Sequence, residues 1–254
     1  MKFYEENGVC FHNQSPQDPE ECLELLQESS SISYLSHAST TLRLKASNSG
    51  QYTQIKIFGS PYSPAQDLWA FGYNQDEAAT LWDAIPLNTD VIITHTPPKH
   101  HCDATTKGPG GCEDLRQILW RVRPKLAVCG HRHQGRGVER VRWRLDGPHA
   151  QDTRNQRRVA HDRGAHDMEE STEAWIDAGL GNKKQSLFDL TAKGRKPLDN
   201  HDDLLGRMGR KETCVVNAAI MATSHAGPKR FNKPIVVDID LPMQDGGEAS
   251  PEDG

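Results

Sequence analysis

The chain has 254 residues, 35% hydrophobic content and a formal net charge of −5 at neutral pH. This length allows one α/β domain or two smaller ones, and the mild negative charge gives no general reason to expect a nucleic-acid partner. No stretch reaches the roughly 18 apolar residues that span a bilayer, and the first residues lack the apolar core of a secretory signal. The six cysteines follow no framework spacing. We therefore expect reduced thiols in a cytoplasmic protein with no membrane partner.

The first predicted elements are a helix and three strands. Asp18, Pro19 and Glu21 combine an N-cap, a proline at the first helical position and a glutamate three residues after the cap. This pattern predicts a helix over 19–28. Apolar runs then predict strands over 32–35, 40–45 and 55–58.

Strands and helices alternate through the middle of the chain. A second capping box at Asn74 and Glu77 predicts a helix that stops before Pro86. A strand, a helix and a strand follow, over 91–93, 115–122 and 126–129. Continuous apolar strands separated by helices are typical of a sheet that is covered on both faces. The pattern therefore predicts an α/β fold.

The composition becomes strongly polar in the second half of the chain, where Arg, Asp, His, Gln and Gly dominate with little periodicity. Such a segment predicts a long polar insertion that is largely disordered. Apolar strands over 213–218 and 234–239 follow it. The expected organisation is one domain over 1–138 and 212–242, an insertion over 139–211 and an acidic tail over 243–254.

Three histidines directly follow apolar strands. His95 comes after the strand over 91–93, and His131 and His133 come after the strand over 126–129. Because the carboxyl ends of parallel strands share one edge of a sheet, we expect these rings to converge there. Imidazole is a common ligand of Zn²⁺, Mn²⁺ and Fe. An isolated His-x-His pair is more often a surface feature, so the pair alone does not establish a metal site.

Other polar clusters allow two interpretations each. His100-His101-Cys102 with Cys112 could hold a structural zinc, but the spacing favours a loop over a substrate cleft. The arginine-rich stretch over 136–158 is interleaved with acids, which favours a solvated insertion over a nucleic-acid arm. Arg132 either contacts a substrate phosphate or points to solvent. The histidines in polar surroundings are interpreted as solvated: His12, His37, His149, His161, His166, His201 and His225.

The order of these motifs resembles the C-terminal half of the calcineurin-like metallophosphoesterases. Thr94-His95-Thr96-Pro97-Pro98 resembles their lone strand-end histidine, and Gly130-His131-Arg132-His133 resembles their G-H-x-H. Gly59-Ser60-Pro61-Tyr62-Ser63-Pro64 is similar to the G-S/A-P-W-S/T-P of their small metallophosphoesterase-domain-containing members. The resemblance covers about 1–138 and 213–241. It implies a β-sandwich flanked by helices, with 1–138 as the C-terminal part of the domain.

The resemblance also implies a chemistry for the histidines. His95 and His131 would hold one divalent transition metal ion and His133 a second, with Mn, Fe or Zn as the candidates. In the family, two such ions clamp a phosphoryl oxygen and generate a hydroxide that hydrolyses a phosphomonoester or phosphodiester. The implied partner is a small phosphorylated substrate, whose phosphate Arg132 would contact in the first of its two interpretations above. No catalytic residue beyond the metal ligands is assigned.

The first half of the family signature does not occur where it would be expected. No D-x-H precedes a strand near the start, no G-D motif follows, and no G-N-H occurs in the sequence. We therefore expect an N-terminally truncated domain that is incompetent as written. The alternative is a non-catalytic remnant that acts as a binding or interaction module.

Overall fold

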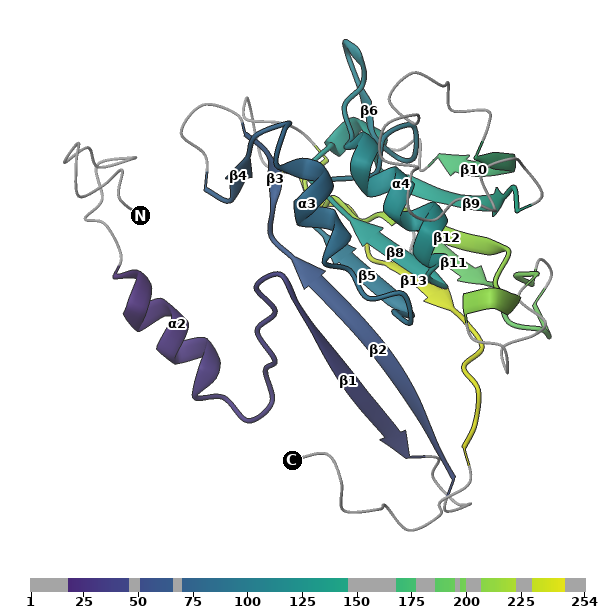
Figure 1. Cartoon of the computed structure of the whole chain (residues 1–254), viewed down its shortest axis with the longest axis horizontal. Helices are drawn as coiled ribbons and strands as arrows, with labels where there is room; N and C mark the ends of the chain where they lie inside the picture. The colour runs from purple at the N-terminus through teal and green to yellow at the C-terminus, as the bar shows by residue number, and fades with distance from the viewer. Residues whose placement is uncertain are drawn as a thin grey trace.

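The computed structural model describes residues 18–45, 51–65, 70–145, 168–176, 186–194, 197–199, 207–222 and 230–244. These residues form a mixed α/β fold around a seven-stranded sheet (Figure 1). In spatial order its strands are β1 (Ala38–Lys45), β2 (Tyr52–Ser60), β5 (Val91–Thr94), β8 (Leu126–Cys129), β12 (Glu212–Asn217), β9 (Gly137–Trp143) and β10 (Glu169–Ile176).

The four central strands of the sheet run parallel. β2, β5, β8 and β12 pair parallel with one another, whereas β1 pairs antiparallel with β2, β9 with β12, and β10 with β9. The carboxyl ends of the parallel strands therefore lie along one edge, at Ser60, Thr94, Cys129 and Asn217. This carboxyl edge carries the candidate site.

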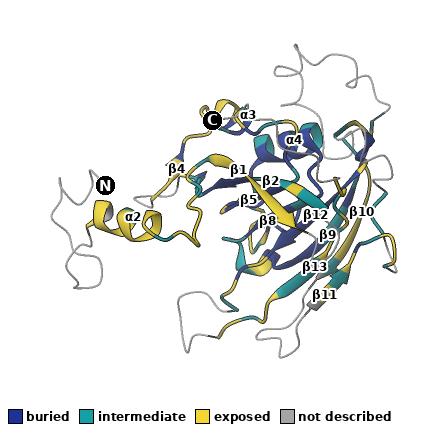
Figure 2. Cartoon of the chain, turned by 90° about the horizontal axis from the view of Figure 1, so that it is seen from below, coloured by how far each residue is buried: buried dark blue, intermediate teal, exposed yellow. Residues whose placement is uncertain are grey.

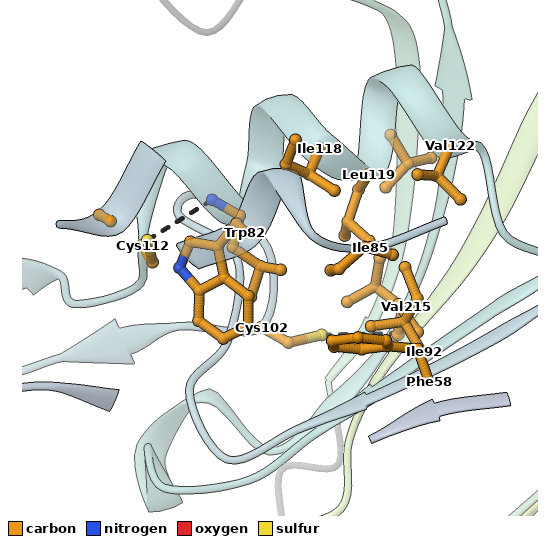
Figure 3. Close-up of a cluster of buried hydrophobic side chains, with 14 of the residues drawn as sticks. Phe58, Trp82, Ile85, Ile92, Cys102, Cys112, Ile118, Leu119, Val122 and Val215 are labelled. Carbon is orange, nitrogen blue, oxygen red and sulfur yellow. Dashed lines mark hydrogen bonds between the residues drawn. The ribbon is translucent and has the colours of Figure 1, made fainter. Parts of the chain in front are cut away.

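Two helices cover one face of the sheet. α3 (Ala78–Asp83) and α4 (Glu113–Val122) bury Trp82 and Leu119 against sheet residues such as Phe58 and Val215 (Figure 3). The side chain of Cys112 accepts a hydrogen bond from the backbone of α4, whose first turn is acidic, an arrangement that stabilises a helix N-terminus. The helices therefore hold the larger of the two hydrophobic clusters.

The opposite face carries a smaller layer. β11 (Ser186–Asp189) and β13 (Ile235–Asp238) form a parallel two-stranded sheet. Their side chains pack with Val138 and Val216 of the main sheet in a second hydrophobic cluster. β13 is buried only in part, as Figure 2 shows by colour.

The remaining elements are short or peripheral. α2 (Pro19–Gln27) stands apart from the sheet and is exposed (Figures 1 and 2). Two short ladders lie near the carboxyl edge, β3 (Ser63–Pro64) with β4 (Gly72–Tyr73), and β6 (Ala104–Thr105) with β7 (Gly108–Pro109). No helix in the described ranges is long and apolar enough to cross a membrane.

Most predicted elements are confirmed to within a few residues. The helices over 19–28 and 115–122 correspond to α2 and α4, and the apolar strands correspond to β1, β2, β5, β8, β12 and β13. The strand predicted over 32–35 is wrong, because these residues form no β-ladder and expose Ile32 and Tyr34. An apolar run becomes a strand only where a neighbouring strand can pair with it.

The segment over 139–211 differs from a disordered insertion where the structure describes it. It contains most of β9 together with β10 and β11, and β9 and β10 belong to the main sheet. Val141 and Trp143 are buried, while the guanidinium of Arg140 pairs with Glu212 at 2.7 Å. β9 is therefore polar in composition although it belongs to the sheet, because its charged residues pair with residues of other strands. Residues 146–167, 177–185, 195–196 and 200–206 of this segment, and the tail beyond 244, lie outside the described residues.

Candidate functional site

The strands bring His95 and His131 together at the carboxyl edge. His95 follows β5 directly and His131 lies two residues beyond β8, its parallel neighbour. His131 Nδ1 and His95 Nε2 are 3.0 Å apart and share a hydrogen bond, and the ring centroids are 4.7 Å apart. The expected convergence of these two rings is therefore present in the structure.

The backbone at His131 is strained. Its φ is +61°, which is uncommon for a residue with a side chain. The Arg132 N–H donates to the Gly130 carbonyl at 2.6 Å, closing a three-residue γ-turn over His131. A left-handed non-glycine residue costs about 1–3 kcal/mol and persists only where its surroundings hold it. The turn aims the His131 ring at His95.

Burial and neighbouring charge keep both rings neutral. Partial burial, Arg132, His95 and His133 together lower the pKa of His131 to about 4. Partial burial and Arg132 also lower the pKa of His95. At neutral pH the rings therefore offer lone pairs, which both a ring–ring hydrogen bond and metal ligation require. His133 opens the short 3₁₀ turn η2 (His133–Gly135), close enough to His131 to affect its pKa.

Arg132 lies between His131 and His133 in the sequence, and its side chain is bonded to the neighbouring loop. Its Nε donates to the Gly110 carbonyl at 3.1 Å, and its guanidinium is near enough to lower the pKa of His95 and His131. Its own carbonyl accepts hydrogen bonds from Gly135 N–H at 3.0 Å and from the Asn217 amide at 2.8 Å. The positive charge of Arg132 is therefore held beside the histidine pair.

The histidine pair fits part of one metal's coordination shell. Two imidazole nitrogens that bind one ion at about 2.1 Å, at angles of about 90–110°, lie about 3.0–3.4 Å apart. The 3.0 Å separation of His131 Nδ1 and His95 Nε2 matches this range. Across the described ranges, however, no group of three or more His, Cys, Asp or Glu side chains is placed to hold a metal ion. The described donors therefore do not fit a centre of two ions.

The Asp-x-His motif, which supplies a carboxylate in the family signature, does not supply one to this site. The chain contains one Asp-x-His triplet, at 199–201. The Asp199 carboxylate pairs with Arg142 at 2.8 Å, and its N–H donates to Glu212, at the opposite edge of the sheet from His131. This triplet is therefore no substitute for a ligand near the histidine pair.

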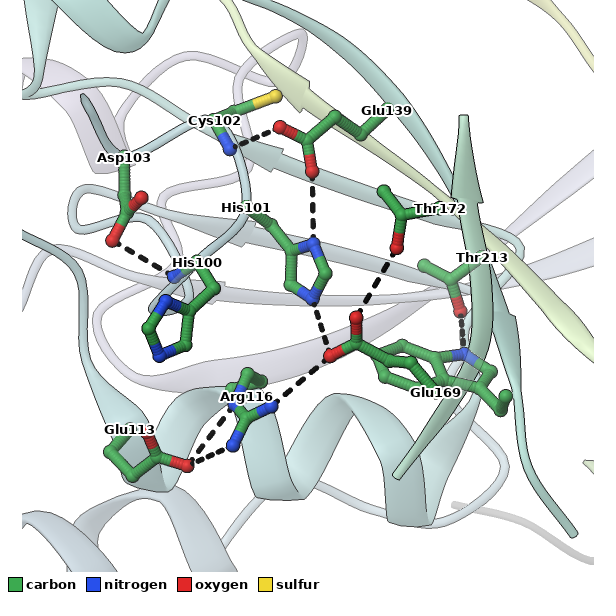
Figure 4. A network of polar contacts seen from close by, with 11 residues as sticks. His100, His101, Cys102, Asp103, Glu113, Arg116, Glu139, Glu169, Thr172 and Thr213 are labelled. Carbon is green, nitrogen blue, oxygen red and sulfur yellow. Dashed lines mark hydrogen bonds and ion pairs between the residues drawn. The ribbon is translucent and has the colours of Figure 1, made fainter. Parts of the chain in front are cut away.

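The His100–Cys102 region, predicted as a loop over a substrate cleft, contains a buried ion cluster (Figure 4). The His101 ring is 1% exposed and bonds Glu139 at 2.9 Å and Glu169 at 3.1 Å. Arg116 also pairs with Glu169, at 3.1 Å. Burial alone would lower the pKa of His101, but the two carboxylates outweigh it and raise the pKa to about 9. The cluster anchors the loop rather than presenting His101 to a ligand.

His37 is not solvated, contrary to the sequence-based interpretation. Its ring nitrogens bond Ser60 Oγ at 3.0 Å and the Leu81 carbonyl at 3.1 Å, and the ring packs edge-on against Phe58 and Tyr62. Composition could not reveal these partners because they are far away in the sequence. The other six histidines of that group lie outside the described residues.

The chain has an α/β fold around a mixed sheet, with paired histidines at the carboxyl edge. This arrangement is consistent with a phosphoesterase-like fold. The chain has homologues whose names agree with this class. It is 39% identical over 88 residues, 33% of the chain, to metallophosphoesterase domain-containing protein 1 of Homo sapiens. It is 42% identical over 86 residues, also 33% of the chain, to a UPF0046 protein of Caenorhabditis elegans. No protein-family model matches the chain.

A further relative carries a name from another class. The chain is 44% identical over 117 residues, 45% of its length, to a probable rhamnogalacturonate lyase C of Emericella nidulans. The chain covers 10% of that protein, 27% of the human relative and 22% of the nematode relative. Each match therefore concerns a limited part of a longer relative.

Proposed function

We propose that this chain belongs to the calcineurin-like metallophosphoesterase superfamily, in its metallophosphoesterase-domain-containing branch. In this proposal His95 and His131 are the ligands of one metal ion, and His133 would be a ligand of the second ion of the family site. The approach of two neutral imidazoles to 3.0 Å at the carboxyl edge carries the proposal. Divalent Mn, Fe or Zn, when bound in such a site, polarises a phosphoryl oxygen and activates water. The reaction class is the hydrolysis of a phosphomonoester or phosphodiester.

The substrate in this proposal is a small phosphorylated molecule. The Arg132 guanidinium, which lowers the pKa of both neighbouring histidines, would attract a phosphate to the same edge. The net charge of −5 argues against a nucleic-acid partner. The described cysteines are free thiols, four of them buried, which supports a cytoplasmic protein. We expect no membrane partner.

The chain as written is proposed to lack efficient turnover. Neutral imidazoles do not offset the mutual repulsion of two dications, and no carboxylate joins the pair among the described side chains. We therefore expect the chain to bind at most one ion. The same observation favours the second candidate function, a non-catalytic binding module that retains the family's sheet.

Metal analysis and kinetics test both candidates. The purified chain is loaded with Mn²⁺ or Zn²⁺, its bound metal is counted, and hydrolysis of an aryl phosphodiester is measured. We expect at most one equivalent of metal, lost in His131→Ala and retained in His100→Ala, which changes an exposed histidine. Two bound equivalents with rapid, His131-dependent turnover would contradict the proposed incompetence. Metal binding that is the same in all three chains would contradict the site.

A further inference from the structure

We infer that Asn217 is a positioning residue for the histidine site, whose side-chain amide ties the backbone between His131 and His133 to the loop at Cys102. The inference rests on the proposed function, because it is the histidine site that gives this position a role. Asn217 makes no contact with a substrate or metal in this proposal. It acts through the segment that it holds.

Asn217 lies at the carboxyl edge, fully buried. It ends β12 and is in register with Cys129, the last residue of β8. Its side chain is 0% exposed. Nδ2 donates to the carbonyls of Cys102 and Arg132, both at 2.8 Å, and Oδ1 accepts from Ala219 N–H at 3.0 Å. An asparagine amide has two N–H donors, and here both are directed at backbone carbonyls of separate segments.

The segment at Cys102 is itself rigidly fixed. Cys102 N–H donates to Glu139 at 2.9 Å, and the same carboxylate bonds the buried His101 ring (Figure 4). Glu139 belongs to β9, which pairs with β12 next to Asn217. The Cys102 carbonyl is therefore fixed in place. Asn217 bonds both this carbonyl and the Arg132 carbonyl, and so connects the fixed segment to the end of β8.

The segment at Arg132 needs such an anchor. The strained turn places the His131 side chain, and the carbonyl that Asn217 holds belongs to the next residue. Without the amide, this carbonyl keeps the Gly135 N–H as its backbone donor, which comes from the same short turn. A strained residue relaxes when its surroundings no longer hold it, and the His131 ring would then leave His95. The Asn217 amide therefore keeps the His131 ring in contact with the His95 ring.

The test compares variants on one strand. Asn217→Asp keeps the shape but removes both N–H donors, and Asn217→Ser restores one donor. Thr213→Val is the matched control, because Thr213 is equally buried and lies at the other end of β12. This substitution also removes one buried hydrogen bond, which Trp143 Nε1 donates to the threonine hydroxyl at 2.9 Å. Long-range ¹H–¹⁵N spectra at neutral pH report the tautomers of His95 and His131. Zn²⁺ titration reports affinity.

We expect fixed tautomers on both rings in the wild type and in Thr213→Val, averaged tautomers in Asn217→Asp and an intermediate result in Asn217→Ser. Zn²⁺ affinity should fall by about 10–100-fold in Asn217→Asp. If Asn217→Asp does not fold, Asn217→Ser decides. Averaged tautomers in the wild type, fixed tautomers in the Asn217 variants, or equal loss in Thr213→Val would overturn the inference. If wild type binds no Zn²⁺ while the tautomer contrast persists, the proposed function fails and the positioning role stands.

Discussion

The buried His101 imidazolium should make stability fall as pH rises. The ring is 1% exposed and lies between the Glu139 and Glu169 carboxylates. Burial opposes its charge, but the carboxylates raise its pKa from 6.5 to about 9. At about 1.4 kcal/mol per pKa unit, the shift corresponds to about 3 kcal/mol of stability. Between these pKa values the folded chain binds one more proton than the unfolded chain, so the free energy of unfolding falls by about 1.4 kcal/mol per pH unit.

The contribution of His101 is therefore complete below about pH 6.5 and lost as the pH rises through about 9. Urea unfolding of wild type and His101→Gln, from about pH 6 to pH 10, measures it as the difference between the two chains. Other titrating groups largely cancel in this difference. We expect about 3 kcal/mol at the acidic end and little of it at the alkaline end. A difference that stays constant with pH would show that the ring is not held as an imidazolium.

Three comparisons test the packing around the site and the core. His131→Gly should be more stable than His131→Ala by about 1 kcal/mol, because only glycine adopts a φ of +61° without strain, and equal thermal midpoints would argue against a strained turn. Gly135→Ala should cost about 1–3 kcal/mol, because the added Cβ would overlap the Cys102 carbonyl oxygen. An unchanged urea midpoint would show that this approach is looser. Trp82→Ala should cost about 3–5 kcal/mol by urea unfolding, because the indole is fully buried, and a loss below about 1 kcal/mol would contradict its place in the core.

The sequence predicts the central strands and the meeting of two histidines for one physical reason. The central parallel strands are continuous apolar runs, as in Val91-Ile92-Ile93, and polar residues mark where they end. Parallel neighbours end at the same edge, so His95 and His131 could be expected to meet without any knowledge of the intervening chain. Local patterns suffice where burial and strand direction determine the result.

The strands β9 and β10 could not be predicted from composition. β9 and β10 carry charges whose partners lie on other strands, such as Arg140 with Glu212 at 2.7 Å and Arg142 with Glu170 at 2.8 Å. Taken alone, each strand looks like solvated chain. Only the pairing between distant segments shows that the charges are satisfied within the sheet. The partners of His101, Glu139 and Glu169, escaped prediction for the same reason.

Asn217 has the same sequence signature as His95, because both are polar residues at the end of an apolar strand. Only the histidines could be predicted as site residues, since imidazole is a common metal ligand and an amide side chain is not. In the structure, backbone hydrogen bonds connect these strand ends. His95 N–H donates to the Ser60 carbonyl and its own carbonyl accepts from Gly130 N–H, both at 3.2 Å. Asn217 continues this connection to Arg132 at 2.8 Å. The carboxyl edge is therefore one hydrogen-bonded unit from β2 to β12, and a change at any of these strand ends should displace the histidine pair.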